Sequence, residues 1–230
     1  ATEFAGEFGG TPYTDLKDLL SDNSIDAVSI CTPSGAHMEP AIKAAASGRH
    51  VIVEKPLEIT RDRCDRMIEA ADRHNVTLAC VFQSRFFENA RLTYDAVQAG
   101  RFGRLVMGEA SIKFYRTQSY YDDGGWKGTR KMDGGGALMN QGIHGIDLLI
   151  WLMGPVEAVQ ARTAILGHER IEVEDAAVAT VEFKNGALGT IQGSTATYPG
   201  FLKRVEISGT QGSAILEEED LKTWTFAEEK

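Results

Sequence analysis

A lysine stands where a predicted strand ends, in a position that suits a proton donor or a partner for an oxyanion. Lys55 comes just after the apolar run 50–53, between Glu54 and Pro56. These neighbours hold its side chain near the edge of a sheet, so that the cation can be aimed at a bound ligand. A surface lysine at a strand end is the alternative, and position alone does not separate the two.

Polar residues interrupt a second segment that is otherwise apolar on nearly every face. The helix predicted after Gly134–Gly136 carries Asn140, His144 and Asp147, and the spacing of four puts Asn140 and His144 on one face. Polar groups on a buried helix need partners or face a cavity. His144 is therefore a candidate general base, because a histidine proton moves near neutral pH. A core histidine bonded to Asp147 or to a backbone carbonyl is the alternative.

The first half of the chain alternates strands and helices. Apolar runs predict strands at 25–31, 50–53 and 76–82, and helices at 38–46 and 60–74 lie between them, with Thr60 as N-cap and Asn75 as terminator. This is a βαβαβ unit with a parallel sheet, in which ligands bind beyond the carboxyl ends of the strands. The candidate ligand-binding residues at these ends are Thr32, Pro33, Glu54, Lys55, Gln83 and Arg85.

The second half predicts an antiparallel sheet. Strands are expected at 105–114, 156–166, 176–183, 188–194, 202–208 and 214–217, and one long buried helix at 137–153 interrupts them. The fold class is therefore α/β followed by α+β. The connection 115–130 is long enough to be functional, and its Trp126 could cover a ligand; a surface or interface loop is the alternative.

Composition narrows the class of protein. The chain has 230 residues, 43% of them hydrophobic and 25% charged, and 24 basic against 33 acidic residues give a formal net charge of −9. An acidic chain without a basic block argues against nucleic acid or an anionic membrane as partner. Three cysteines without metal-ligand spacing predict no metal site and favour a reducing compartment, so we expect a cytoplasmic protein. No Gly-rich phosphate loop precedes the first predicted strand, and we expect the chain to be truncated at both ends.

Four passages resemble the Gfo/Idh/MocA family of oxidoreductases, the glucose–fructose oxidoreductase and inositol dehydrogenase group. They are residues 26–37 with Thr32, Pro33 and His37; residues 50–56 with Glu54-Lys55-Pro56; residues 134–147; and residues 173–176. The resemblance implies a partial NAD(P)-binding Rossmann domain over 1–102. It also implies an incomplete C-terminal α+β domain over 103–230 that binds substrate and makes oligomer contacts.

The resemblance also implies roles for single residues. Lys55 is expected near substrate and nicotinamide, and His144 is the expected acid/base residue, whereas Asn140 stands where many members have an aspartate. His37 joins the candidate cofactor-binding residues. We expect Lys55 and His144 to face one cleft with Asn140 beside them, and the Lys55–Pro56 bond to be cis.

The expected activity is hydride transfer between the nicotinamide of NAD or NADP and a carbinol carbon of a sugar, sugar nucleotide or polyol. The expected partners are this small-molecule substrate and further copies of the chain, as a dimer or tetramer. An NAD-dependent glycosidase and a non-catalytic dinucleotide-binding regulator are the alternatives.

Overall fold

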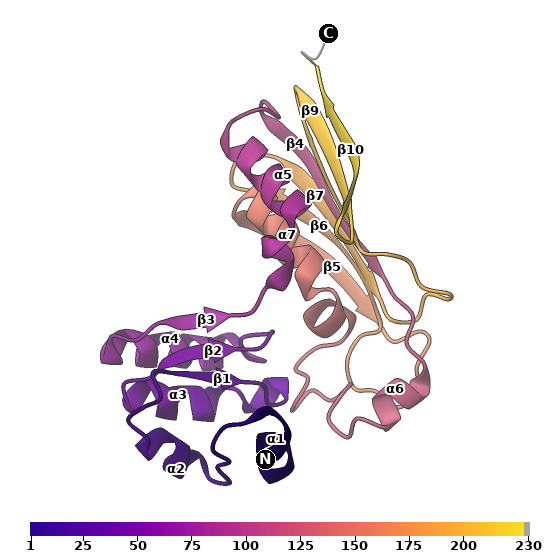
Figure 1. The fold of residues 1–230 in the computed structure, drawn as a ribbon. Coiled ribbons are helices and arrows are strands. Elements are labelled where there is room, and N and C mark those ends of the chain that lie inside the picture. The colour runs from indigo at the N-terminus through magenta and orange to yellow at the C-terminus, as the bar shows by residue number, and fades with distance from the viewer. Residues whose placement is uncertain (228–230) are drawn as a thin grey trace. The chain divides into compact units, whose positions relative to one another are not determined.

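The computed structural model describes residues 1–227 and divides the chain into two compact units. The first unit is Ala1–Val81, and the second begins at Phe82 (Figure 1). Within the described residues, no helix combines the length and the apolar character that crossing a membrane requires.

The first unit is built on a parallel sheet in the order β1-β2-β3. Its strands are short and rich in Val, Ile and Ala, as strands of parallel sheets are. In chain order its elements are α1 (Thr2–Phe8), α2 (Leu16–Ser21), β1 (Ala27–Ile30), the 3₁₀ turn η1 (Ser34–Ala36), α3 (Met38–Ala46), β2 (His50–Val53), α4 (Arg61–His74) and β3 (Leu78–Cys80).

Caps predicted from the sequence define helix α4. The Thr60 hydroxyl accepts a hydrogen bond from the Arg63 amide, and Asn75 ends the helix with φ 53° and ψ 46°, in the left-handed region. Both predictions are confirmed, as is the parallel βαβαβ arrangement. The core of this unit joins the central strand β2 to α3 and α4, through Val51, Val53, Met38 and Met67 among others.

The second unit is built on one seven-stranded sheet in the order β10-β9-β8-β4-β7-β6-β5. Its elements are the 3₁₀ turn η2 (Gln83–Phe86), α5 (Glu88–Gln98), β4 (Leu105–Lys113), α6 (Gln118–Asp122), the π-helical turn η3 (Ala137–Gln141), α7 (Ile143–Met153), β5 (Val156–Ala164), β6 (Ala176–Phe183), β7 (Leu188–Ser194), β8 (Arg204–Gly209), β9 (Gly212–Glu217) and β10 (Asp220–Phe226).

The sheet departs from the antiparallel prediction at one pair of strands. Strands β4 and β7 run parallel, with Met107 opposite Leu188 and Lys113 opposite Ser194, so the sheet is mixed. The reason is the chain path, because β4 enters the sheet before the other strands and lies between β7 and β8. Strand β10, formed by Asp220–Phe226, was not predicted.

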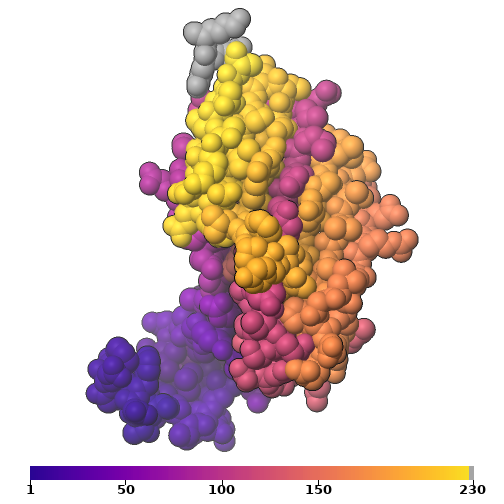
Figure 2. Space-filling model, turned by 90° about the vertical axis from the view of Figure 1, so that its right-hand side faces the viewer, coloured from indigo at the N-terminus to yellow at the C-terminus, as the bar shows by residue number. Residues whose placement is uncertain are grey.

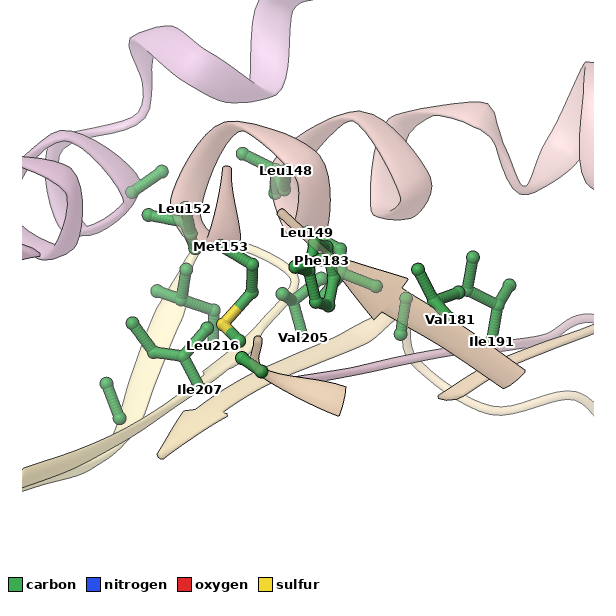
Figure 3. Close-up of a cluster of buried hydrophobic side chains, with 14 of the residues drawn as sticks. Leu148, Leu149, Leu152, Met153, Val181, Phe183, Ile191, Val205, Ile207 and Leu216 are labelled. Atoms are coloured by element: carbon green, nitrogen blue, oxygen red, sulfur yellow. The ribbon is translucent and has the colours of Figure 1, made fainter. Parts of the chain in front are cut away.

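Helix α7 covers one face of the sheet and closes its core. Leu148, Leu149, Leu152 and Met153 are almost completely buried against side chains of the strands beneath (Figure 3). Gly108 of β4 allows this approach, since a Cβ at that position would lie 2.8–2.9 Å from the side chains of Met153 and Leu149. Burying four large apolar side chains stabilises the unit by roughly 1.5–3 kcal/mol each.

The opposite face of the sheet carries no helix of this unit within the described residues. In Figure 2 the magenta strip of β4 lies between the yellow C-terminal strands and the orange strands β5–β7. Met107, Val178 and Leu188 stand on this face and are 47%, 56% and 55% exposed. We refer to the outward side of β4, β6 and β7 as the open face.

Candidate functional site

The segment that carries Lys55 leaves the parallel sheet through a cis peptide bond. The Lys55–Pro56 bond is cis, as predicted from the sequence. The side chain of Glu54 turns back on the chain, and its Oε2 accepts a hydrogen bond from the Lys55 amide at 3.3 Å. The amide of Glu54 itself donates to the carbonyl of Ile30. The backbone around Lys55 is therefore held at the carboxyl end of β2.

His37 supports this segment from the neighbouring strand end. It is 1% exposed, and its Nδ1 lies 2.9 Å from the Pro56 carbonyl oxygen while its Nε2 lies 2.8 Å from that of Thr32. The ring thus ties the end of β1 to the residue after Lys55. Its predicted contact with a cofactor stays a prediction.

A buried carboxylate anchors the far side of the same loop. Glu58 is 2% exposed, and it accepts hydrogen bonds from the Ile59 amide at 2.6 Å and from Arg63 at 2.8 Å. Burial alone would raise the pKa of Glu58, but the hydrogen bonds from Arg63 and Ile59 outweigh it and lower the pKa. A further, longer bond from the Met38 amide ties this loop to the first turn of α3.

His144 lies in the first turn of α7, in the second unit. Its ring contacts the ring of Phe82 edge-on, with centroids 6.2 Å apart. Asp147, one turn further on, is paired with Arg85: Nε and Nη2 of Arg85 donate to its two carboxylate oxygens at 2.8 and 2.6 Å. The guanidinium also lies over the ring of Trp151. Arg85 thereby fixes η2 to α7, and its role in cofactor binding stays a prediction.

The helix predicted over 137–153 is divided into two parts, and the division falls beside the candidate catalytic residues. Residues Ala137–Gln141 form a π-helical turn, in which the amide of Gly142 donates to the carbonyl of Ala137, and α7 begins at Ile143. Single π-helical turns are frequent at functional sites. This turn sets the direction of Asn140 relative to His144.

Glu174 holds the start of the π-helical turn. Its carboxylate accepts from the amides of Gly136 and Leu138 at 2.9 and 3.1 Å, and its carbonyl accepts from Ala137. A negative charge here also complements the exposed amides of a helix start. Gly136 is required by this approach, because a Cβ at that position would overlap the carbonyl oxygen of Glu174.

The connection 115–130 is attached to the residue next to Asn140. Gln141 accepts a hydrogen bond from Arg116 and donates one to the hydroxyl of Tyr120, both at 2.9 Å. The Lys127 ammonium lies 3.9 Å from the centre of the Tyr120 ring, a cation–π contact. Trp126 is partly buried, and its carbonyl accepts from Thr129. Whether Trp126 covers a ligand stays a prediction.

Asp175 and His168 form a buried pair that contacts the connection 115–130, and the sequence analysis did not predict it. Asp175 accepts from the amides of Leu166, Gly167 and His168, and the Nδ1 of His168 lies 2.9 Å from the same carboxylate. Burial would raise the pKa of Asp175, but these hydrogen bonds outweigh it and lower the pKa. The other nitrogen of His168 lies 2.9 Å from the carbonyl oxygen of Arg116. The sequence feature that could have indicated this pair is the acidic dipeptide Glu174-Asp175, just before the strand predicted at 176–183.

The predicted site residues therefore fall into two groups. The first unit brings together Thr32, Pro33, His37, Glu54 and Lys55 at the carboxyl ends of β1 and β2, with Thr32 exposed and its hydroxyl bonded to the Ala36 carbonyl. The second unit holds Gln83, Arg85, Trp126, Asn140 and His144, and Gln83 is exposed on η2. The common cleft for Lys55 and His144 stays a prediction.

Comparison with known proteins identifies both units. Residues 1–82 match the family described as an oxidoreductase family with an NAD-binding Rossmann fold, and residues 91–215 match the GFO/IDH/MocA C-terminal domain. The chain therefore belongs to the Gfo/Idh/MocA family of oxidoreductases, as the resemblance implied.

Named relatives act on sugars and polyols. The myo-inositol 2-dehydrogenase of Thermotoga maritima is 31% identical over 87% of this chain and 59% of its own length. The levoglucosan dehydrogenase of Pseudarthrobacter phenanthrenivorans is 28% identical over 94% of this chain and 61% of its own length. The chain thus spans about three fifths of the length of these curated relatives.

A solved structure is similar over the whole chain. The WlbA dehydrogenase of Bordetella pertussis, in complex with NADH and UDP-GlcNAcA, is 38% identical, with a TM-score of 0.93 over 100% of this chain and 67% of that one. This agreement confirms the fold class predicted from the sequence, apart from the parallel pair in the second sheet.

Proposed function

We propose that this chain belongs to an NAD(P)-dependent oxidoreductase that moves a hydride between nicotinamide and a CH–OH carbon of a sugar, sugar nucleotide or polyol. The observation that carries the proposal is the anchoring of Asn140 and His144 at the junction of η3 and α7, where Glu174 and Asp133 hold the turn. The similarity to dehydrogenases named for inositol and levoglucosan, and to a dehydrogenase solved in complex with NADH and UDP-GlcNAcA, supports this class of substrate.

The proton chemistry is divided between two residues. Oxidation of an alcohol releases a hydride from carbon and a proton from oxygen. His144 takes the hydroxyl proton, and the Lys55 cation stabilises the negative charge that develops on that oxygen. Asn140 forms a hydrogen bond with a neighbouring hydroxyl of the substrate and so orients the reacting carbon. In the reverse direction His144 returns the proton to the carbonyl oxygen.

The first unit fits a dinucleotide at the carboxyl ends of its strands. Open parallel sheets bind their ligands there, and Thr32, Pro33, Glu54 and Lys55 come together at these ends. Bound nicotinamide would supply the hydride acceptor, and these residues would hold its side of the cofactor. Gln83, Arg85 and Trp126 of the second unit complete the set of candidate contacts.

We also infer that the protein works as a homo-oligomer in the cytoplasm. The open face exposes Met107, Val178 and Leu188, and a second copy of the chain is the occupant we propose for it. The odd number of cysteines and their lack of metal-ligand spacing support the proposal of a reducing compartment.

A substrate screen with the full-length protein tests the proposal. The panel contains inositols, anhydrosugars, free hexoses and UDP-linked uronic acids, each with NAD and with NADP, and formation of the reduced cofactor is followed by absorbance. We expect turnover with at least one member and production of NADH or NADPH in proportion to the oxidised sugar. Release of a free sugar without net reduction of the cofactor would indicate the glycosidase, and dinucleotide binding without turnover would indicate the regulator.

A further inference from the structure

A buried carboxylate stands behind Asn140. Asp133 is 2% exposed and lies in the connection before the triple glycine, seven residues ahead of Asn140. Its Oδ1 accepts a hydrogen bond from Nδ2 of Asn140, and its Oδ2 accepts one from the amide of Gly128 at 2.8 Å. The backbone of Asp133 is fixed as well, because its amide donates to the carbonyl of Thr129.

These contacts determine which way the Asn140 amide points. Both carboxyl oxygens of Asp133 act as acceptors, Oδ1 from Asn140 and Oδ2 from the Gly128 amide, so the NH₂ end of Asn140 faces Asp133. The carbonyl end, Oδ1, then points away from Asp133. The Gly128 amide keeps Asp133 from rotating, since it holds the second carboxylate oxygen. An asparagine held in this way acts as a hydrogen-bond acceptor at Oδ1, as an aspartate at the same position would.

We propose that Asp133 is the positioning residue that fixes Asn140 as an acceptor for a substrate hydroxyl next to the one that gives its proton to His144. This inference rests on the proposed oxidoreductase function and deepens it. The carboxyl group that an aspartate at position 140 would place against the substrate stands here one hydrogen bond further back, at Asp133. Asn140 touches the substrate, and Asp133 acts only through Asn140.

The isosteric variant Asp133→Asn is expected to reverse the amide. The substituted side chain still accepts from the Gly128 amide with its oxygen, so its own NH₂ group faces Asn140. Two NH₂ groups cannot bond each other, and Asn140 turns its oxygen toward residue 133 and its NH₂ toward the substrate. We expect kcat to fall on the order of 10- to 100-fold, the scale of a misplaced reacting group, with an unchanged melting curve. Asp123→Asn, at an exposed aspartate of the connection 115–130, is the matched control and keeps the wild-type kcat.

The reciprocal exchange makes the test specific. Asn140→Asp alone places two carboxyl groups in contact, so that one of them keeps a proton and the pH profile of kcat acquires an additional ionisation. In the double variant Asp133→Asn, Asn140→Asp, the NH₂ group of residue 133 donates to the carboxylate of residue 140. We expect this variant to recover most of the activity and to lose the additional ionisation. A double variant no more active than Asn140→Asp overturns the proposal.

A second measurement does not depend on turnover. Wild type, the two single variants and the double variant form a double-mutant cycle in urea unfolding, and the side-chain amide signal of Asn140 can be followed by nitrogen-15 NMR. We expect the exchange to restore the unfolding midpoint, and we expect the Asn140 amide signal to move in Asp133→Asn and not in Asp123→Asn. Midpoints that change additively, with an unmoved signal, overturn the proposal. A wild-type protein that oxidises no sugar while the cycle shows coupling would instead refute the oxidoreductase function.

Discussion

At the scale of single residues, the groups with proposed chemical roles are held through backbone contacts made by their neighbours. Lys55 follows Glu54, whose carboxylate bonds the Lys55 amide, and precedes Pro56, whose carbonyl lies against His37. Such contacts fix the backbone position of Lys55 without using its ammonium group. A substitution of the Lys55 side chain can therefore test the chemical role of the ammonium group while the backbone contacts stay in place.

Lys55→Met is the first test of the chemistry. Methionine keeps an unbranched stem and removes the charge, so packing changes little, but the developing oxyanion loses its cation. Removing one such partner costs about 2.7–4 kcal/mol of transition-state stabilisation, which corresponds to a fall in kcat of about 100-fold or more. The measurement is kcat with the substrate found in the screen, beside a melting curve. Near-normal kcat would remove Lys55 from the mechanism, and a lost melting transition would mean that its role is structural.

Asp175 gives a prediction on stability against pH. Its pKa in the folded chain lies below the ordinary value of 3.8, so its carboxylate stabilises the fold fully above that value. As the pH falls from about 4 toward the folded pKa, the unfolded chain binds the proton first and this stability is lost. We expect Asp175→Asn to lower the free energy of unfolding at neutral pH by about 1–3 kcal/mol, since one acceptor oxygen becomes an NH₂ group that cannot accept from the backbone amides. In the acid range, the free energy of unfolding of this variant should depend less on pH than that of the wild type.

Urea unfolding at a series of pH values measures both effects. Asp122→Asn is the control, because Asp122 is an exposed partner of Arg170 and such pairs contribute little. His168 faces the same carboxylate, with its Nδ1 2.9 Å from Oδ2 of Asp175. If Asp175→Asn and wild type lose stability in parallel below about pH 4, the buried carboxylate is not the cause.

At the scale of elements, local signals predicted the first unit well. Thr60 and Asn75 carry their own capping chemistry, and the apolar runs at 27–30 and 50–53 are typical of buried strands. The second unit depended more on distant contacts. The parallel pairing of β4 with β7 is decided by where β4 enters the sheet, and Asp220–Phe226 contains too many polar residues to be recognised as a strand without β9 beside it.

The candidate site also contains residues that local sequence signals predict and residues that only distant contacts reveal. Lys55, Asn140 and His144 could be selected from residue type and spacing. Asp133 and Glu174 could not, because each acts on a segment separated from it in the sequence, through hydrogen bonds at 2.9–3.1 Å in the case of Glu174. The division of the helix at Gln141 was also missed, since the apolar residues Met139, Ile143 and Ile146 keep helical spacing across Gly142.

Gly136→Ala tests whether the π-helical turn is needed. The new methyl group would overlap the carbonyl oxygen of Glu174, so either the turn or the segment before β6 must shift. We expect a lower melting temperature and a fall in kcat larger than the change in KM, because Asn140 and His144 follow from this turn. Gly6→Ala in α1 is the control, since nothing lies within 4 Å of a Cβ there. A variant with wild-type kcat would show that the entry to the turn is not critical.

At the scale of the whole molecule, the second sheet buries only one of its faces within the described residues. The helix side is closed by α5 and α7, whereas the open face presents Met107 and Leu188 as neighbours on adjacent strands. A stable interface between two proteins buries roughly 1,200–2,000 Å², and a seven-stranded sheet offers a broad surface suited to that size. The face is also low in charge along β7, which favours a copy of itself over an acidic or basic partner.

The open face gives the last prediction. Leu188→Lys places a charge on the face without touching the core, because the neighbouring Gly189 and not Leu188 points toward Phe183. If two copies pair through this face, the variant should shift to the monomer in sedimentation or light scattering while its melting curve stays cooperative. Ile68→Lys, at a residue 44% exposed on α4, is the matched control and should keep the oligomer. An unchanged assembly in Leu188→Lys would place the subunit contact elsewhere, and a monomeric wild type would mean that this face is not an interface between copies.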